Sequence, residues 1–222
     1  MTYTVKEIFY TLQGEGLHVG RPAVFCRFSG CNLWTGRESD RASAVCTFCD
    51  TDFVGIGPDG GRFHDAESLA DAVAALWPVE HATAPSETSR PHPKPFVVCT
   101  GGEPLLQLDD QAIDAFHARG FEVAVETNGT QNAPATIDHV CVSPKANALL
   151  VLRHGNELKL VYPQTQPSAQ PECFQDLPFD HFFLQPMDGP ELQQNTAKAL
   201  AYCLANPKWR LSIQTHKIVG IR

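Results

Sequence analysis

The chain has 222 residues, of which 43% are hydrophobic and 19% charged, enough for one globular domain with a substantial core. Its formal net charge of -8 argues against broad electrostatic binding to nucleic acid. The first residues do not resemble a signal peptide and no apolar run is long enough to cross a membrane, so we expect a cytoplasmic protein with no membrane partner.

The N-terminal region predicts an apolar segment, a polar turn and a strand. Val5 to Phe9 is a short apolar segment that leads into Thr11-Leu-Gln-Gly-Glu-Gly16. The glycines on either side of Glu15 indicate an unusual backbone turn with outward polar side chains, although this hexapeptide alone favours an ordinary surface turn. Ala23 to Phe28 is rich in β-formers and predicts a strand, and Arg27 within it is expected to lie at a strand end or to be paired.

Three cysteines follow this strand in a polar loop, at positions Cys31, Cys46 and Cys49. Three thiolates can ligate three irons of a four-iron cluster and leave the fourth iron open for chemistry. A zinc knuckle is equally compatible with the cysteines alone, with His18 or His64 as the nearest candidates for a fourth ligand. A thioredoxin-like Cys-x-x-Cys pair is a further alternative, but it leaves Cys31 unexplained.

The remaining cysteines differ from these three in their surroundings. Four of them lie within apolar runs and are predicted to be core residues: Cys26, Cys99, Cys141 and Cys203. Cys173 lies in a polar loop and has no predicted role. In the cysteine loop itself, Phe48 favours a cluster because an aromatic ring shields it, and the hydroxyl of Thr51 suits Mg²⁺ or a helix N-cap.

The rest of the chain alternates strands with helices. Helices are expected from Asp65 to Trp77, from about Asp109 to Gly120 and from about Pro190 to Ala205, and a proline-rich loop over residues 78–95. Strands are expected at Phe96–Thr100, Phe121–Glu126, His139–Val142, Glu157–Val161, His181–Leu184 and Arg210–Ile213. About six parallel strands with three helices predict an α/β fold, a partial, open TIM-like barrel, in a single domain over residues 1–222. Polar motifs follow these strands, and the carboxyl ends of parallel strands are where α/β proteins place their sites.

Two of the motifs together resemble the radical S-adenosylmethionine enzymes: Cys31 with Cys46-Thr-Phe-Cys49, and Gly101-Gly-Glu-Pro104. The resemblance implies a 4Fe-4S cluster on the three cysteines and S-adenosylmethionine bound at the glycine motif. The chain departs from the family's usual Cys-x3-Cys-x2-Cys pattern, because Thr35 stands where the second cysteine falls. Fourteen residues separate Cys31 from Cys46, so we expect an enlarged cluster loop over residues 31–49, with the role of residues 32–45 open.

A narrower resemblance covers nearly the whole chain. Eight blocks, in order, are similar to the family of 7-carboxy-7-deazaguanine synthases: Thr11-Leu-Gln-Gly-Glu-Gly16, Arg27, Cys49-Asp-Thr51, Thr100-Gly-Gly-Glu-Pro104, Glu126-Thr-Asn-Gly-Thr130, Ser143-Pro-Lys145, Gln185-Pro-Met-Asp188 and Gln214-Thr-His-Lys217. The implied activity is a radical lyase that converts 6-carboxy-5,6,7,8-tetrahydropterin to 7-carboxy-7-deazaguanine, with ring contraction and loss of ammonia, for queuosine and related deazapurines. The implied partners are a flavodoxin- or ferredoxin-type reductant and a second copy in a homodimer.

The same resemblance implies roles for individual residues. Cys31, Cys46 and Cys49 would hold the cluster, and Thr51 would hold Mg²⁺. Contacts to S-adenosylmethionine are implied for Phe48, Asp50, Gly102, Glu103, Ser143, Pro144, Lys145, Gln185 and Asp188. Contacts to the substrate are implied for Leu12, Gln13, Gly14, Glu15, Arg27, Thr100, His216 and the C-terminal carboxylate of Arg222, where the family often has proline.

Two other functions remain open at this point. One is a different radical S-adenosylmethionine enzyme, such as an activase that abstracts hydrogen from a glycine of a partner protein. The Gln-Gly-Glu-Gly block and Arg27 favour a small acidic heterocycle as substrate instead. The other is a binding module without catalytic activity, stabilised by zinc or built like a ferredoxin.

Overall fold

The computed structural model describes residues 1–78 and 94–222, so the predicted loop over residues 78–95 lies almost wholly outside the described residues. In the described part, nine strands form one sheet in the order β3-β1-β2-β4-β5-β6-β7-β8-β9. The strands are β1 (Tyr3–Leu12), β2 (Pro22–Phe28), β3 (Gly61–Phe63), β4 (Phe96–Gly101), β5 (Glu122–Thr127), β6 (His139–Val142), β7 (Gly155–Tyr162), β8 (Phe179–Pro186) and β9 (Trp209–Leu211).

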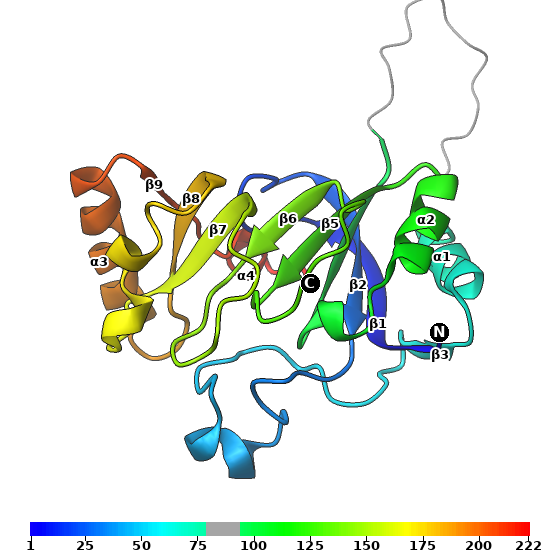
Figure 1. Cartoon of the computed structure of the whole chain (residues 1–222), viewed down its shortest axis with the longest axis horizontal. Helices are drawn as coiled ribbons and strands as arrows, with labels where there is room; N and C mark the ends of the chain where they lie inside the picture. Colours follow the sequence, from blue (N-terminus) through cyan, green and yellow to red (C-terminus); the bar gives the residue numbers. More distant parts are fainter. Residues whose placement is uncertain (79–93) are drawn as a thin grey trace, which may run out of the picture.

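The sheet is mostly parallel and stays open. Strand β1 pairs antiparallel with β2 and β3, whereas β2 and β4 to β9 pair in parallel across the rest of the sheet. Strands β3 and β9 form its two edges and do not pair with each other, and Figure 1 shows the sheet curving between them. The predicted α/β class and the partial, open barrel are therefore confirmed.

Four α-helices accompany the sheet in the described residues: α1 (Ala66–Ala74), α2 (Asp110–Ala118), α3 (Leu192–Ala205) and α4 (Thr215–Val219). The first three match the predicted helices. Asp65 caps α1 by accepting a hydrogen bond from the Ser68 amide at 2.8 Å, as its sequence position predicts. Helix α4 was not predicted because five residues are too few for a periodic signal. No helix in the described ranges has the length and apolarity that a membrane crossing requires.

The first helix is shorter than predicted. It ends at Ala74, so placing Leu76 and Trp77 within it is wrong. Pro78 lies four residues after Ala74, and a proline holds the residue before it, here Trp77, out of helical conformation. Trp77 nevertheless packs against the core, while Leu76 is exposed.

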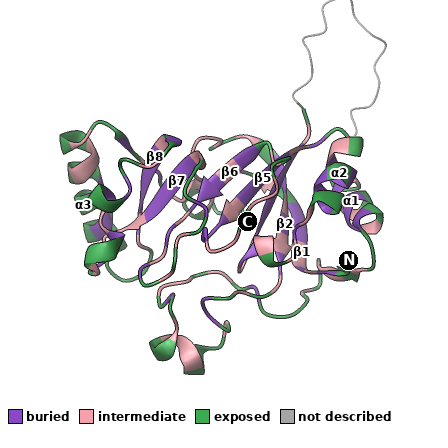
Figure 2. Cartoon of the chain, viewed as in Figure 1, coloured by how far each residue is buried: buried purple, intermediate pink, exposed green. Residues whose placement is uncertain are grey.

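The two faces of the sheet have different chemistry because side chains alternate along each strand. On one face, Val24, Cys26 and Phe28 of β2 join the core that contains α1 and α2, and Leu158 and Leu160 of β7 join the core that contains α3. Figure 2 shows these strands buried while the outer sides of the helices stay exposed. The opposite face carries polar side chains at the intervening positions: Glu7, Arg27, Thr100, Glu126, Lys159 and Gln185, all of which line one cavity.

Candidate active site

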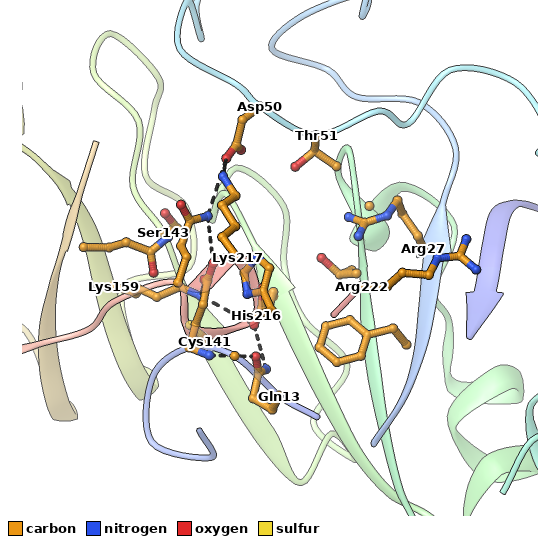
Figure 3. Close-up of a pocket in the computed structure, with 18 of the residues that line it drawn as sticks. Gln13, Arg27, Asp50, Thr51, Cys141, Ser143, Lys159, His216, Lys217 and Arg222 are labelled. Carbon is orange, nitrogen blue, oxygen red and sulfur yellow. Dashed lines mark hydrogen bonds and ion pairs between the residues drawn. The ribbon is translucent and has the colours of Figure 1, made fainter. Parts of the chain in front are cut away.

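A cavity of about 350 Å³ lies on the polar face of the sheet. Figure 3 shows side chains from several strands, the cysteine loop and the C-terminal segment pointing into it. The predicted site residues that line it are Leu12, Gln13, Gly14, Glu15, Arg27, Asp50, Thr51, Thr100, Gly102, Ser143, Lys145, Gln185, His216 and Arg222. The fold therefore brings together residues from all eight sequence blocks within one cavity.

A second, smaller cavity of about 70 Å³ lies beside the cysteine loop. The predicted site residues that line it are Cys46, Phe48, Cys49, Asp50, Gln185 and Asp188. Asp50, Gln185 and Gln214 line both cavities, so the two spaces share a wall.

Glu103 lies apart from both cavities, as do Cys31 and Pro144. It is fully buried and accepts hydrogen bonds from the Thr127 hydroxyl at 2.7 Å, the Asn128 amide at 2.8 Å and the Leu105 amide at 3.0 Å. Burial raises the pKa of this carboxyl group, and the three donors oppose that rise. Glu103 thus ties the turn after β4 to the turn after β5, and its implied contact with S-adenosylmethionine stays a prediction.

The glycine motif also packs against the protein itself. A Cβ on Gly102 would collide with the carbonyl of Gly30 and the side chain of Cys31, and a Cβ on Gly101 would collide with the backbone of Phe28. Gly101 has a φ of 148°, which disfavours other residues. The glycines are therefore needed to seat the start of the cysteine loop against the end of β4.

The three cysteines lie near one another in the loop after β2. Cys46 is buried, and Cys31 and Cys49 are half-buried. A hydrogen bond from the Cys46 thiol lowers the pKa of Cys49 to about 6. Burial acts to raise this pKa, whereas the Thr51 amide and the charge of Lys145 act to lower it. The same hydrogen bond, together with burial, raises the pKa of Cys46, and burial raises that of Cys31. Cys49 is therefore the one of the three that is held toward the thiolate, the form that ligates iron.

The described residues contain no group of three or more His, Cys, Asp or Glu that converges on a single ion. A four-iron cluster is larger than one ion and takes ligands that stand further apart. The half-buried thiols, their mutual proximity and the adjacent small cavity fit such a cluster better than they fit a zinc knuckle.

The inserted part of the cysteine loop contacts the turn that carries Cys46 and Cys49. It includes a 3-10 helix, η1 (Glu38–Ser43), which projects below the carboxyl ends of the strands in Figure 1. From it, Arg41 donates to the carbonyls of Thr47 at 3.2 Å and Cys49 at 3.0 Å, and stacks over Trp34 at 4.0 Å. The insertion thus supports the backbone of the Cys46–Cys49 turn.

Thr51 lines the larger cavity, and no helix follows it. The alternative role as a helix N-cap is therefore wrong, since residues 51–60 form an irregular loop. Its hydroxyl oxygen remains available at the cavity wall for a hard cation.

A buried charged cluster forms the floor of the larger cavity. Lys159 of β7 forms ion pairs with Glu15 and, at 3.5 Å, with Glu126 of β5. Burial acts to lower the pKa of Lys159 because it disfavours the charged form. The negative charges of Glu126 and Glu15 have the larger effect and hold this pKa well above its usual value. Burial acts to raise the pKa of Glu15. The positive charge and hydrogen bond of Lys159 have the larger effect, so this pKa lies below its usual value. Gln13 joins the cluster by donating to Glu126 at 2.9 Å.

Arg27 lies on the opposite side of the cavity with Arg222 (Figure 3). Its Nε donates to Glu7 at 2.8 Å, and Arg222 donates to the other oxygen of Glu7 at 2.6 Å and to Asp59 at 2.7 Å. Among the described residues, the two terminal nitrogens of Arg27 make no hydrogen bond. Arg27 lines the cavity, and a guanidinium group with both terminal nitrogens free can donate to a carboxylate in a bidentate contact.

The C-terminal segment crosses the mouth of the cavity. The amide and hydroxyl of Thr215 donate to the carbonyl of Gly14 at 3.0 and 2.8 Å, and the His216 ring packs so closely on Gly14 that a Cβ there would collide with it. The main-chain oxygen of Arg222 accepts a hydrogen bond from the Thr11 hydroxyl at 3.0 Å. The segment thereby holds the turn that carries Gln13 and Glu15.

A second buried pair supports the same turn from below. His139 and Glu157 lie 2.5 Å apart with both side chains buried, and Glu157 also accepts a hydrogen bond from the Leu17 amide at 3.0 Å. Burial acts to raise the pKa of Glu157, but His139 and Lys159 outweigh it and hold the pKa below its usual value.

This pair predicts a pH dependence of stability. Because the folded pKa of Glu157 lies below the unfolded value of 4.5, its contribution is fully present above that value and is lost as the pH falls through the folded pKa. We expect the free energy of unfolding to decrease below about pH 4.5, and less steeply in Glu157→Gln than in the unsubstituted protein. Urea unfolding at a series of pH values measures this; identical slopes in the two proteins would contradict it.

Several residues of the site were not predicted as site residues. Lys159, Glu126, Glu7, Gln214 and Lys217 line the cavity, and Cys141, which was predicted to be a core residue, also lines it. Lys159 had a detectable signal, since a lysine between Leu158 and Leu160 in a buried strand needs a partner. Glu126, Gln214 and Lys217 lie within the quoted blocks, but nothing local distinguishes them.

Comparisons with known proteins agree with this site. No protein-family model matches the chain. It is 62% identical over 222 residues to the 7-carboxy-7-deazaguanine synthase of Caulobacter vibrioides and 61% identical over 223 residues to that of Bradyrhizobium diazoefficiens, in each case over 100% of both chains. It is also similar to the crystal structure of QueE from Escherichia coli, with a TM-score of 0.67 and 26% identity over 96% of this chain and 94% of that one. The chain therefore belongs to the family of 7-carboxy-7-deazaguanine synthases.

Proposed function

We propose that this protein converts 6-carboxy-5,6,7,8-tetrahydropterin to 7-carboxy-7-deazaguanine as a radical S-adenosylmethionine lyase. The observation that carries this proposal is the shared wall of the two cavities, at Asp50, Gln185 and Gln214. It places a space beside the cysteines next to a space lined by Arg27 and the Lys159 cluster. A cofactor bound beside the cysteines would extend from this small space along the shared wall and would therefore lie against a substrate in the larger one, as radical transfer requires.

Cys31, Cys46 and Cys49 would hold a 4Fe-4S cluster, and the chain around them would bind S-adenosylmethionine. When bound, these groups supply an electron and, from it, a 5′-deoxyadenosyl radical that abstracts hydrogen from the substrate. Phe48, Asp50, Gln185 and Asp188 line the smaller cavity, while Gly102, Ser143 and Lys145 approach from the larger one. Pro144 lies between the last two and keeps their turn extended.

Lys145 is prepared for a negatively charged ligand group. Its ammonium group donates to the carbonyl and the hydroxyl of Ser143 at 2.6 and 2.7 Å, and burial holds its pKa below the usual value. A carboxylate in the cavity would stabilise its charge, which supports a role in binding the cofactor's carboxylate.

The larger cavity matches a planar heterocycle with one carboxylate. The free terminal nitrogens of Arg27 support binding of the substrate carboxylate at one side. Glu15 and Gln13 line the other side. Their oxygen atoms already accept hydrogen bonds from Lys159, Gln214 and the Glu15 amide, and their remaining lone pairs would accept the paired N–H donors of an aminopyrimidinone edge. Leu12, Gly14, Thr100, His216 and Arg222 complete the lining around it.

Anaerobic turnover tests the proposal. The reconstituted protein, with reductant and S-adenosylmethionine, is expected to form 7-carboxy-7-deazaguanine and ammonia from the carboxytetrahydropterin. Cleavage of S-adenosylmethionine without any conversion of this pterin would exclude the proposed substrate. A colourless protein with bound zinc and no labile sulfide would exclude the whole radical mechanism.

Because Thr51 lines the larger cavity, we expect the rate of turnover to depend on Mg²⁺. Its hydroxyl, next to the carboxylates of Asp50 and Asp52 at the cavity wall, suits a cation that holds substrate oxygens. We expect Thr51→Ala to raise the Mg²⁺ concentration that gives half-maximal turnover by about tenfold, with unchanged iron content. Equal turnover with chelated, metal-free buffer and with added Mg²⁺ would show that no such cation acts.

The protein's partners and compartment also belong to this proposal. A single catalytic domain over residues 1–222 would act as a homodimer and receive electrons from a flavodoxin- or ferredoxin-type reductant. Thiols that must stay reduced to bind a cluster support a cytoplasmic location. Light scattering tests the dimer, and replacing dithionite by reduced flavodoxin tests the electron donor.

A further inference from the structure

Lys217 joins three separate parts of the chain at the edge of the site. Its ammonium group lies 2.6 Å from Asp50 in the cysteine loop and 2.6 Å from Asp188 after β8, while its own backbone belongs to α4. Figure 3 shows the lysine reaching across the cavity to Asp50. One side chain thus links the cysteine loop, the end of the sheet and the C-terminal segment.

The position of this link relates the two cavities to each other. Lys217 lines the larger cavity, Asp188 lines the smaller one, and Asp50 lines both. Gln214, one turn before Lys217, also lines both and donates to Asp50 at 3.4 Å and to Glu15 at 3.1 Å. The link therefore forms part of the wall between the cofactor space and the substrate space.

The hydrogen bonds leave part of each carboxylate unused. Within the described residues, Oδ2 of Asp50 accepts hydrogen bonds from the side chains of Lys217 and Gln214. Oδ2 of Asp188 accepts one from Lys217. The Oδ1 atoms face no side-chain donor. A lysine that occupies one oxygen of each carboxylate fixes the rotation of both and presents the other oxygen in a constant direction.

We propose that Lys217 is a positioning residue, which orients Asp50 and Asp188 toward the cofactor and holds the cofactor at a fixed distance from the substrate cavity. This inference rests on the proposed function. The side chains of these ion pairs are between 34% and 43% exposed, so their contribution to stability is small and their main effect is on geometry. Without the lysine, two like charges share the wall and repel each other, and the cofactor loses its alignment with the substrate.

Misalignment has a specific chemical consequence. A 5′-deoxyadenosyl radical formed out of reach of the substrate would take a hydrogen atom from the protein or the buffer instead, and 5′-deoxyadenosine would then accumulate without product. The ratio of accumulated 5′-deoxyadenosine to 7-carboxy-7-deazaguanine therefore reports on positioning, whereas a general loss of folded or cluster-loaded enzyme lowers both amounts together.

The test compares Lys217→Met, Lys217→Arg and a matched control, Lys198→Met on α3, as reconstituted holoenzymes. We expect Lys217→Met to raise that ratio by about threefold or more and to weaken S-adenosylmethionine binding in equilibrium dialysis by about tenfold, with iron content unchanged. Lys217→Arg, which keeps the positive charge, is expected to show a product ratio and an affinity for S-adenosylmethionine close to those of the unsubstituted protein. Lys198→Met is expected to match the unsubstituted protein.

A readout independent of turnover completes the experiment. Hydrogen–deuterium exchange over residues 214–222 is expected to be faster in Lys217→Met than in the unsubstituted protein, because α4 has lost its link to Asp50 and Asp188. An unchanged product ratio, cofactor affinity and exchange rate in Lys217→Met would overturn the inference, provided that the unsubstituted enzyme turns over the pterin. If the unsubstituted enzyme itself forms no product, the proposed function fails instead.

Discussion

Cys46→Ala is expected to abolish turnover completely. Cys46 would supply one of three cluster ligands, and a cluster held by two cysteines is lost or inactive. We expect the variant to bind little iron, to lose the brown colour of the reconstituted protein and to cleave S-adenosylmethionine at least about a thousandfold more slowly. Iron and sulfide analysis, the visible spectrum and cleavage assays measure these changes.

The control for this experiment is Cys173→Ala. Cys173 is exposed and far from the cysteine loop in sequence, so the variant is expected to keep full iron content and activity. Circular dichroism is expected to be the same for both variants, since the core of the sheet does not include Cys46. A Cys46→Ala protein that retains its full cluster and activity would show that this cysteine is not a ligand.

Arg27→Ala is expected to lower kcat/KM for the pterin by between about thirtyfold and several thousandfold. Truncating one partner of a desolvated, charge-assisted contact costs about 2–5 kcal/mol, and each 1.4 kcal/mol corresponds to about tenfold. Glu7 keeps Arg222 as a partner at 2.6 Å in the variant, so we expect little loss of stability. Iron content and cleavage of S-adenosylmethionine without pterin are expected to stay unchanged.

Arg21 offers a matched control for Arg27. It forms a bidentate pair with Glu122 at 3.0 and 2.8 Å and stacks over Phe96, but it does not line the cavity. Arg21→Ala is expected to leave kcat/KM near the value of the unsubstituted enzyme. If Arg27→Ala loses its cluster and its fold, Arg27 is structural and does not act on the substrate.

The architecture was largely predictable because its signals are local. Runs such as Phe96 to Thr100 combine β-formers with a following glycine, and Asp65 and Asp109 stand at helix starts with the expected caps. Strand β3 and helix α4 were missed because three and five residues are too short for a periodic pattern. Their formation depends on pairing with β1 and on contacts with Gly14, which no local window contains.

The contents of the site were predictable only in part. The resemblance to the family led to Arg27, Glu15 and Gln13, and all three line the cavity. The partners of these residues were not predictable from local sequence. Lys159 pairs with Glu15 across 144 positions, and Lys217 pairs with Asp50 across 167. The same long-range packing places Glu103 beneath the turns after two strands, and its implied contact with S-adenosylmethionine stays a prediction.

The cysteine loop is expected to deliver a radical to a substrate held by Arg27 and Glu15. To test this, 6-carboxy-5,6,7,8-tetrahydropterin labelled with deuterium at C6 is turned over anaerobically by the reconstituted protein. We expect deuterium at the 5′ position of the recovered S-adenosylmethionine or 5′-deoxyadenosine, together with 7-carboxy-7-deazaguanine. Product formation with no deuterium at that position, or cleavage of the cofactor with no product, would contradict it.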